Sequence, residues 1–460
     1  MYKVDYSHPI TVHFMGIGGI SMSGLAEVLL GQGFTVTGSD RAPSPLTEHL
    51  EGLGARIYYP QAAENITDEV ELVVYTAAIS EDNPELVEAK RRELPLLTRA
   101  QLLGQIMDHY EKSIAVAGTH GKTTTSSMLG QILLYGDKKP TLSIGGIFPA
   151  IHSNILVGES DVFLTEACEY TNSYHSLKPR YGVILNIEED HLDFFKDLDD
   201  IRRSFTTFAE GISESGLLAI SGDIPDLDEI TGSLDCRVTT FGLSGAYDVH
   251  PVDLFYDDKG CATFTPVIGG VSHGEIKLSV PGEHNVKNAL AAIAIAEDLG
   301  ISDDQIARGL EDFTGTVRRF EKKGVYKGAQ IIDDYAHHPT EISATLSAAG
   351  ALHISGKLRV VFQPHTYTRT KALLPEFAKA LSVADEVIMA DIYAAREKDI
   401  YGVSSRNVAD AINSNGGNAI YLGTFDAIED YLEKNLMNGD LLITMGAGNV
   451  NEVGEKLLGL

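Results

Sequence analysis

The sequence predicts an α/β protein of three domains, each with a mostly parallel sheet covered by helices. The chain of 460 residues holds the material of three domains at the usual size of about 150 residues each. Strand-like and helix-like segments alternate along it, and the alternation starts again near residues 108 and 318. Hydrophobic residues make up 43% of the chain, which argues for packed cores rather than disorder. We therefore expect domains at 1–108, 109–318 and 319–460.

The first domain opens with a strand, a glycine-rich turn and a helix. The β-rich run 11–15 precedes the turn, and an apolar helical pattern follows it over 21–30. This order is typical of a Rossmann-like unit, in which the turn and the helix N-terminus hold a phosphate. Asp40 ends the next strand, where such units place a ribose-binding carboxylate. Ser21 stands where a third glycine is usual, so a purely structural turn is the alternative to a phosphate site at Gly16, Gly18 and Gly19.

The second domain opens with the sharpest motif of the chain, GTHGKTTT. The apolar strand 113–117 runs into this glycine-rich turn, and a helix follows from about 124 to 134. Backbone N–H groups of such a turn point at one spot, and the helix dipole adds to them. Val116 stands where a full P-loop has glycine, so the match is to the shorter G-x-x-G-K-T core, and a coincidental turn is the alternative. The motif predicts a nucleotide site formed by Gly118, Thr119, His120, Gly121, Lys122, Thr123 and Thr124.

Two further candidates follow apolar strands of the same domain. Glu166 comes after the run 162–165, and Asp190-His191 comes shortly after the run 181–185. Both therefore lie at the carboxyl ends of the sheet, where doubly wound folds bind ligands. With Thr123 they provide a set of magnesium ligands, whereas each taken singly is an ordinary loop residue. The stretch 236–280 is rich in β-formers and turns and predicts an antiparallel edge.

The third domain repeats the alternation after residue 319. Its strand-like segments are 329–332, 357–362, 386–390, 418–421 and 440–444. Polar residues follow two of these segments, among them His337, His338 and Arg369. Arg369 has the geometry to hold a carboxylate in bidentate fashion, while a loop hydrogen bond is the plain alternative for each histidine.

Acidic residues exceed basic ones by 65 to 36, a formal net charge of −29. This balance argues against nucleic-acid and anionic membrane partners, although one site can be locally positive. Three widely spaced cysteines without a CxxC pair fit a reducing compartment. We expect no secretory signal, because the first residues contain no apolar run with a cleavage site. The strongest apolar run, 289–296, is too short to span a bilayer, so a cytoplasmic location is expected.

An ordered series of motifs extends over almost the whole chain. It comprises GIGGISMSGLA, YTAAI, GTHGKTTT, EACEY, NIEEDHLD, PGEHNVKNALAA, RRFE, DDYAHHPTEI, FQPHTYTRT and GDLLITMGAGNV. The series resembles that of the Mur ligases. The resemblance implies a Rossmann-like N-terminal domain for the UDP end of a sugar nucleotide, a central P-loop ATPase-like α/β domain, and a C-terminal Rossmann-like domain for the amino acid.

The resemblance also implies a reaction and its partners. ATP phosphorylates the lactyl carboxylate of UDP-N-acetylmuramate, and the amine of an amino acid then attacks the acyl phosphate. Within the family, the segments DDYAHHPTEI and QPHTYTRT favour L-alanine over D-glutamate or later residues. A recycling ligase that attaches a preformed tripeptide to the same sugar nucleotide shares most of these motifs. A nicotinamide dehydrogenase, which needs only the first glycine turn, and a non-catalytic nucleotide sensor are the alternatives from other classes.

The resemblance assigns roles to residues at matching positions. The catalytic set is Lys122, Glu166, His191, Arg319 and His338. The implied cofactor, magnesium, has the ligands Thr123, Glu166 and His191. The resemblance places adenine near His284 and Asn288. The residues that it assigns to the UDP-sugar are Gly16, Gly18, Gly19 and Asp40. The residues that it assigns to the substrate carboxylate and the amino acid are His338 and Arg369. No side chain is assigned as the general base, and we expect a monomer or a weak homodimer.

Three departures from the family pattern limit what is carried over. Several Mur ligases use a carbamylated lysine after the DH motif, but residues 200–210 contain no lysine, so this feature is not carried over to the chain. The segment EACEYTNSY differs from the usual EADES form. The contacts that the family pattern implies for Glu169 to Ser173 are therefore not carried over, whereas the role of Glu166 is. Thr366 replaces an arginine that is frequent in the family, so one substrate contact is missing or supplied elsewhere.

Overall fold

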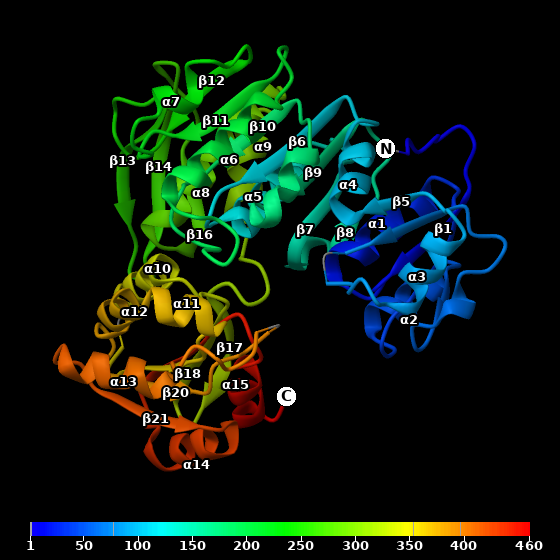
Figure 1. Ribbon diagram of the computed structural model, residues 1–460. Coiled ribbons are helices and arrows are strands. Elements are labelled where there is room, and N and C mark those ends of the chain that lie inside the picture. Colours follow the sequence, from blue (N-terminus) through cyan, green and yellow to red (C-terminus); the bar gives the residue numbers. More distant parts are fainter. Residues whose placement is uncertain (1, 77, 353, 396) are drawn as a thin grey trace. The chain divides into compact units, whose positions relative to one another are not determined.

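The structure, a computed structural model, describes residues 2–76, 78–352, 354–395 and 397–460 (Figure 1). Ala77, part of the YTAAI motif, lies outside the described residues. The predicted α/β fold class is confirmed, because helices alternate with strands that form three largely parallel sheets. No helix among the described residues has the length and apolar composition that crossing a membrane requires. The chain divides into a first unit of Met1–Ile187, Arg202–Phe241 and Ala291–Gln305 and a second unit of Glu188–Ile201, Gly242–Leu290 and Ile306–Leu460.

The N-terminal sheet of the first unit is entirely parallel, in the order β3-β2-β1-β4-β5. Its strands are β1 (Thr11–Met15), β2 (Thr35–Ser39), β3 (Arg56–Tyr58), β4 (Leu72–Tyr75) and β5 (Leu96–Thr98). The connecting helices are α1 (Ile20–Gly31), α2 (Pro45–Gly52), η1 (Ala63–Asn65), α3 (Pro84–Arg91) and α4 (Arg99–Met107). Because the chain adds strands on one side of β1 and then on the other, the strand order reverses between β1 and β4. Ligands of doubly wound sheets bind in the crevice at such a point.

The first unit contains a second, larger set of strands in the order β12-β11-β10-β6-β9-β7-β8. All neighbours are parallel except β7 and β8. The strands are β6 (Lys112–Ala117), β7 (Thr141–Phe148), β8 (Ser153–Leu156), β9 (Val162–Glu166), β10 (Tyr181–Ile184), β11 (Leu217–Ser221) and β12 (Arg237–Phe241). Residues 113–117 of β6 are all buried, because a parallel strand with a neighbour on each side is covered on both faces.

The helices of this region are α5 (Lys122–Tyr135), η2 (Pro149–Ile151), η3 (Tyr170–Ser176), α6 (Leu198–Glu210), α7 (Asp228–Thr231), α8 (Glu283–Asp298) and α9 (Asp303–Glu311). In the second unit, β14 (Cys261–Ile268) pairs antiparallel with β13 (Val249–Tyr256), β15 (Val271–Ser272) and β16 (Ile276–Pro281). The antiparallel edge predicted over 236–280 therefore begins at β13. Strand β12, inside the same stretch, pairs parallel with β11.

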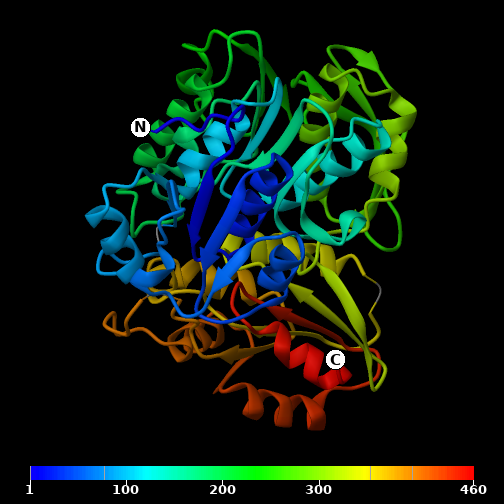
Figure 2. The ribbon, with the colours of Figure 1, turned by 90° about the vertical axis from the view of Figure 1, so that its right-hand side faces the viewer.

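The C-terminal sheet of the second unit has the order β17-β18-β22-β19-β20-β21, and only β17 is antiparallel. Its strands are β17 (Glu321–Tyr326), β18 (Ala329–Asp334), β19 (Leu358–Phe362), β20 (Glu386–Ala390), β21 (Ala419–Gly423) and β22 (Leu441–Met445). Its helices are α10 (Pro339–Gly350), α11 (Tyr367–Ala372), α12 (Leu374–Leu381), α13 (Ser405–Ser414), α14 (Phe425–Asn435) and α15 (Asn451–Leu458), the last drawn in red in Figures 1 and 2.

Alternate residues of the C-terminal strands enter separate cores, as the two-residue period of a strand requires. Val360 and Phe362 pack with residues of α10, α12 and α13. Val361, between them, packs with residues of α14 and α15. Helices therefore cover both faces of this sheet, the arrangement of a doubly wound fold. The polar loops that follow the parallel strands of this sheet lie at its carboxyl edge.

Candidate functional site

The glycine-rich turn between β6 and α5 has a backbone that other residues rarely adopt. The φ angle is +142° at Gly118 and +86° at Gly121, both in the range that favours glycine. A Cβ atom on Gly118 would also lie 2.9 Å from the Cβ of Leu185. Gly121 precedes the first turn of α5 without any side-chain cap. The free N–H groups of that turn, together with the helix dipole, form an anion site.

Asn186 holds this turn in place from a neighbouring strand. Its Oδ1 accepts the N–H of His120 at 2.7 Å, and its Nδ2 donates to the carbonyl oxygen of His120 at 3.1 Å. Its own carbonyl accepts the N–H of Thr119 at 3.2 Å. Asn186 follows β10, which pairs with β6, so the contact comes from the register of the sheet. Sequence reasoning missed this role, although Asn186 lies in the NIEEDHLD motif.

Lys122, the predicted phosphate ligand, makes an ion pair with Glu169. Its Nζ lies 3.1 and 2.9 Å from the two carboxylate oxygens, and it also donates to the carbonyl oxygens of Gly118 and Thr119. The side chains of Lys122 and Glu169 are 16% and 4% exposed. Burial lowers the pKa of Lys122, but Glu169 and nearby acidic groups outweigh burial and hold the pKa above its ordinary value. The lysine is therefore charged and already has an anionic partner.

Glu166 and Thr123 lie on adjacent elements at the carboxyl edge of the sheet. Glu166 ends β9, and its register partner in β6 is Val116, just before the glycine-rich turn. One oxygen of Glu166 accepts the N–H of Gly145 at 2.7 Å. A Cβ atom on Gly145 would lie 2.6 Å from the other oxygen, so a larger residue there would require this carboxylate to shift. Thr123 contributes a buried hydroxyl in the first turn of α5, and oxygen donors of this kind are the ligands that magnesium prefers.

The N-terminal glycine turn is braced by Asp40. Its Oδ2 accepts the N–H of Gly18 at 2.7 Å, and a Cβ atom on Gly18 would lie 2.8 Å from the same oxygen. Gly16 has a φ of +78°, and its N–H donates to the carbonyl oxygen of Ser39 at 2.9 Å. The carboxylate predicted for a ribose thus also shapes the turn, because it binds an amide predicted for the diphosphate. Gly19 is the N-cap of α1 and has no side-chain cap of its own.

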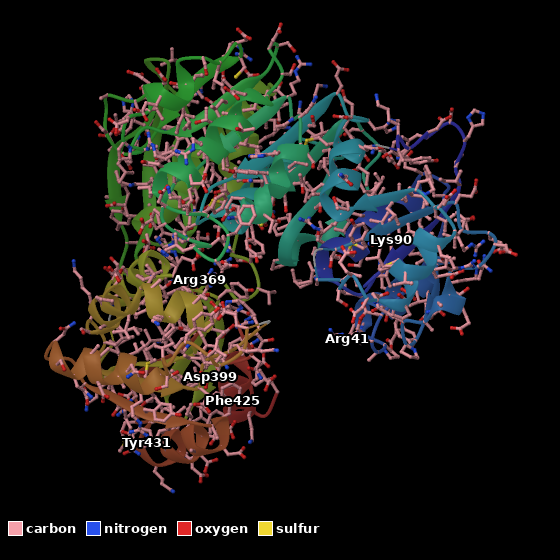
Figure 3. All side chains as sticks on the ribbon, in the orientation of Figure 1. Arg41, Lys90, Arg369, Asp399, Phe425 and Tyr431 are labelled. Atoms are coloured by element: carbon pink, nitrogen blue, oxygen red, sulfur yellow. The ribbon has the colours of Figure 1, made fainter. Side chains whose placement is uncertain are left out.

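In the second unit, Asp190 of the DH segment forms an ion pair with Arg369 on α11. Arg369 is labelled in Figure 3. Nε and Nη2 of Arg369 donate to one Asp190 oxygen at 3.0 and 2.8 Å. Burial raises the pKa of the Asp190 carboxyl, but Arg369 and nearby imidazoles hold it well below its usual range. The same carboxylate accepts the N–H of His191 at 2.7 Å, and His191 has a φ of +53°. Asp190 therefore positions both predicted residues.

His338 caps α10 and also binds the DH segment. Its Nδ1 accepts the N–H of Thr340 at 3.4 Å, and its Nε2 lies 3.1 Å from the carbonyl oxygen of Glu189. A single neutral tautomer with the proton on Nε2 satisfies both contacts. Glu341, one turn along α10, accepts the N–H of His338 at 3.3 Å and lies 3.6 Å from Nη1 of Arg319. His338 and Arg319 are therefore linked through Glu341.

The two arginines of the RRFE motif have different surroundings. Arg318 donates to Asp333 at 2.9 Å and to the carbonyl oxygens of Gly448 and Gly446 at 2.8 Å each. These bonds tie it to the GDLLITMGAGNV segment. Both arginines lie over the ring of Tyr335, Arg318 at 5.1 Å and Arg319 at 5.0 Å from its centroid, but Arg319 pairs with Glu341 instead. Arg318 is a structural residue, and Arg319 belongs to the predicted substrate end.

The predicted adenine residues occupy the start of α8 in the second unit. Asn288 donates to Oδ1 of Asn285 at 3.2 Å, and Asn285 donates to the carbonyl oxygen of Pro281 at 2.7 Å. Gly282 has a φ of +101°, and a Cβ atom on it would lie 2.6 Å from the ring of His284. His284 and Asn288 are four positions apart, so they project from the same side of the helix.

Each unit thus brings together its own subset of the predicted residues. The first unit collects the nucleotide turn with Lys122, Thr123 and Glu166, and separately the N-terminal turn with Asp40. The second unit collects His191, Arg319, His338 and Arg369 through Asp190, Glu189 and Glu341. Sequence reasoning passed over the connecting groups, namely Glu169, Asn186, the carboxylate role of Asp190, and Glu341.

Family models and related proteins match the chain along its whole length. Three models match in order: "Mur ligase family, catalytic domain" over 11–111, "Mur ligase middle domain" over 116–296, and "Mur ligase, glutamate ligase domain" over 318–448. A UDP-N-acetylmuramate–L-alanine ligase of Agathobacter rectalis is 55% identical over 458 residues, covering 100% of both chains. The protein of the same name from Lachnospira eligens is 53% identical over 459 residues, again covering 100% of both.

Solved structures agree with these relatives. The crystal structure of a UDP-N-acetylmuramate–alanine ligase from Thermotoga maritima is 30% identical, with a TM-score of 0.81 and 98% of each chain covered. A murein peptide ligase from Psychrobacter arcticus is 25% identical, with a TM-score of 0.72 and the same coverage.

Proposed function

The chain belongs to the Mur ligase family, and we propose that it joins L-alanine to the lactyl carboxylate of UDP-N-acetylmuramate in a reaction driven by ATP. The observation that carries the proposal is the full-length identity of 55% and 53% to two ligases of that name. The products are UDP-N-acetylmuramoyl-L-alanine, ADP and phosphate. The chain is therefore an enzyme of peptidoglycan precursor synthesis.

The reaction needs an activated carboxylate, because a carboxylate anion is a poor electrophile. A lactyl oxygen attacks the γ-phosphorus of ATP, ADP leaves, and an acyl phosphate forms. The amine of L-alanine, having lost a proton, then attacks the carbonyl carbon. The bond from that carbon to the phosphate oxygen breaks, and phosphate departs with the electron pair. Both steps bring anions together, so positioning and positive charge are what the protein must supply.

Lys122 and the glycine-rich turn supply positive charge to the nucleotide phosphates. The uncapped amides of α5 point into the turn, and Lys122 is charged there. The phosphates must take Lys122 from Glu169, its present partner at 2.9 Å. Asn186 holds the amides of Thr119 and His120 in place during this exchange. His284 and Asn288 serve the adenine.

Thr123, Glu166 and His191 would hold magnesium, which neutralises phosphate charge when it is bound. Thr123 and Glu166 suit magnesium because both offer oxygen donors, Thr123 in the first turn of α5 and Glu166 at the end of β9. Glu166 keeps one oxygen oriented by the N–H of Gly145. His191 is oriented by Asp190, whose carboxylate is in turn fixed by Arg369.

The remaining residues bind the two other substrates. Gly16, Gly18 and Gly19, braced by Asp40, offer amides to the UDP diphosphate. Arg319, His338 and Arg369 serve the muramoyl end and the carboxylate of the amino acid, for which a guanidinium is suited. We propose the domains 1–108, 109–318 and 319–460, a monomer or weak homodimer, and a cytoplasmic location without nucleic-acid or membrane partners.

An amino-acid panel tests the proposal. Phosphate release is measured with ATP, magnesium and UDP-N-acetylmuramate, in the presence of L-alanine, glycine, L-serine or the preformed tripeptide. We expect turnover with L-alanine and none with the tripeptide. Turnover with the tripeptide alone would assign the chain to the recycling ligases, and NADH formation or turnover without ATP would remove it from the ligases.

A further inference from the structure

His337 is a partly buried histidine that the mechanism described above does not use. It lies between β18, which ends at Asp334, and α10, which begins at Pro339. Its side chain is 18% exposed, and its Nδ1 lies 3.0 Å from the carbonyl oxygen of Tyr335 and 3.2 Å from Oε2 of Glu341. A carbonyl and a carboxylate oxygen only accept hydrogen bonds, so Nδ1 carries the proton of the neutral ring. Nε2 is therefore left with an unprotonated lone pair.

This lone pair distinguishes His337 from two neighbouring imidazoles. Within residues 2–76, 78–352, 354–395 and 397–460, Nε2 of His337 has no hydrogen-bond partner. Nδ1 of His365 accepts from Nη1 of Arg369 at 3.1 Å, and Nδ1 of His338 accepts the N–H of Thr340 at 3.4 Å. When neutral, each of these two rings carries its proton on Nε2. Of the three imidazoles, His337 is thus the one whose Nε2 can accept a proton from a bound molecule.

His337 lies close to the arginine that we propose for the carboxylate of the amino acid. The centroids of the His337 and His365 rings are 5.8 Å apart, and His365 bonds directly to Arg369. In L-alanine the amine and the carboxylate are attached to the same carbon atom. A carboxylate held by Arg369 therefore brings the attacking amine among the side chains that surround this arginine.

The charges around His337 keep its ring neutral. The groups that face the ring are Glu341 on α10, Arg369 on α11, Asp190 of the DH segment, and His365 and Tyr335 of the loops after β19 and β18. Burial lowers the pKa of His337 to about 3, and Arg369 acts in the same direction, whereas Glu341 and Asp190 oppose it. A carboxylate bound to Arg369 offsets the charge of that arginine, so the pKa of His337 rises when the amino acid binds.

We propose that Nε2 of His337, with the ring oriented by Glu341, accepts the proton that the amine of L-alanine loses when it attacks the acyl phosphate, an inference that rests on the proposed function. The nitrogen forms its bond to the carbonyl carbon, and one N–H proton passes to Nε2. The bond from that carbon to the phosphate oxygen breaks, and phosphate leaves with the electron pair. The imidazolium then returns its proton to water.

The state of the nitrogen explains why a weak base suffices. During the attack the nitrogen becomes positively charged, and the carbon to which it is bound carries two oxygen atoms. Its proton is therefore far more acidic than a proton of the free ammonium group. Glu341 has the part that a carboxylate plays beside a catalytic histidine, because it fixes the tautomer and stabilises the imidazolium once it forms.

The test compares two nucleophiles that attack the same acyl phosphate. Hydroxylamine at high concentration traps an acyl phosphate as a hydroxamate without a base from the protein. Hydroxamate formation and ligation of L-alanine are measured for the wild type, His337→Gln and the control His8→Gln, whose ring is exposed and paired with Asp5. In His337→Gln we expect kcat for L-alanine to fall about 10²–10⁴-fold, the range for general base catalysis, and hydroxamate formation to stay within about twofold. Both rates should be unchanged in His8→Gln.

Chemical rescue adds a readout that a structural role would not move. Imidazole added to His337→Gly should restore part of the turnover with L-alanine, in proportion to the neutral form of imidazole as the pH rises. The wild type should not respond to it. Absence of rescue together with an unchanged kcat in His337→Gln would overturn the proposal.

Two further results would also overturn it. The ratio of ligation to hydroxamate formation in one sample does not depend on how much of the protein is folded, so an unchanged ratio in His337→Gln means that His337 does not act on the amine. A raised KM for L-alanine with an unchanged kcat means that His337 only binds the amino acid. If the wild type forms both products, these results refute the role of His337 alone; if the wild type forms neither, the proposed function is refuted.

Discussion

Glu169→Gln tests the energetic role of the buried ion pair at the nucleotide turn. Lys122 and Glu169 are 2.9 Å apart, with side chains 16% and 4% exposed. At this distance the Coulomb attraction is about 6 kcal/mol for an effective dielectric constant of about 20, before the cost of desolvation is subtracted. Removing one partner of a buried pair costs about 3–5 kcal/mol, because the other charge stays buried alone. Lys122 retains some exposure, so we expect a loss of about 3 kcal/mol.

The loss is measured as a melting temperature, with and without a non-hydrolysable ATP analogue. For a domain of about 200 residues, about 3 kcal/mol lowers the melting temperature by about 6–12 °C. The analogue should raise it more in Glu169→Gln than in the wild type, since its phosphates no longer compete with Glu169 for Lys122. Glu159→Gln is the matched control: its pair with Lys139 is 3.0 Å long, but the side chains are 78% and 58% exposed, so a loss below about 1 kcal/mol is expected.

Two results would refute this reasoning. One is a melting temperature of Glu169→Gln that equals that of Glu159→Gln, which would mean that burial adds nothing to the pair. The other is an equal gain from the analogue in Glu169→Gln and the wild type, which would mean that the phosphates and Glu169 do not share Lys122.

Three further predictions concern turnover, the nucleotide turn and pH. Lys122→Ala should lower kcat by about 10²–10³-fold in a phosphate-release assay, because it removes the charge facing the transferred phosphate; near-normal kcat would contradict the mechanism. Asn186→Ala should raise the KM of ATP about tenfold and leave that of L-alanine unchanged, since it removes the two side-chain hydrogen bonds to the N–H and the carbonyl oxygen of His120 in the turn; equal changes in both would contradict a local effect. Burial raises the pKa of Asp334 to about 6, against the opposing charge of Arg319, so the folded state takes up this proton before the unfolded state as pH falls. From pH 7 to pH 5 the wild type should therefore gain about 1 kcal/mol of stability relative to Asp334→Asn, measured by urea unfolding followed by circular dichroism; a difference that does not vary with pH would contradict the assignment.

Much of the fold is predictable because buried parallel strands leave a plain signal in the sequence. The segment 386–390 coincides with β20, and 357–362 begins one residue before β19 (Leu358–Phe362). Both are apolar runs covered on each face. The edge strand β17 (Glu321–Tyr326) was not predicted, because its residues are largely polar and exposed, so no apolar run marks it.

The part of the site that could be predicted from the sequence is the part whose residues lie together in one short segment. The nucleotide turn, with Gly118 and Lys122, is such a segment. The groups that hold it come from far along the chain: Glu169 is 47 residues from Lys122, and Asn186 is 66 residues from His120. Only the order of strands in the sheet brings such residues together, and a single sequence does not specify that order.

The most direct measurement follows one oxygen atom through the reaction. UDP-N-acetylmuramate labelled with oxygen-18 in both lactyl carboxylate oxygens is incubated with ATP, magnesium, L-alanine and the enzyme. If the carboxylate attacks ATP, one labelled oxygen appears in the released phosphate and the other remains in the new amide. Phosphate without label, or an unlabelled amide, would contradict the acyl-phosphate route and with it the role given to Lys122.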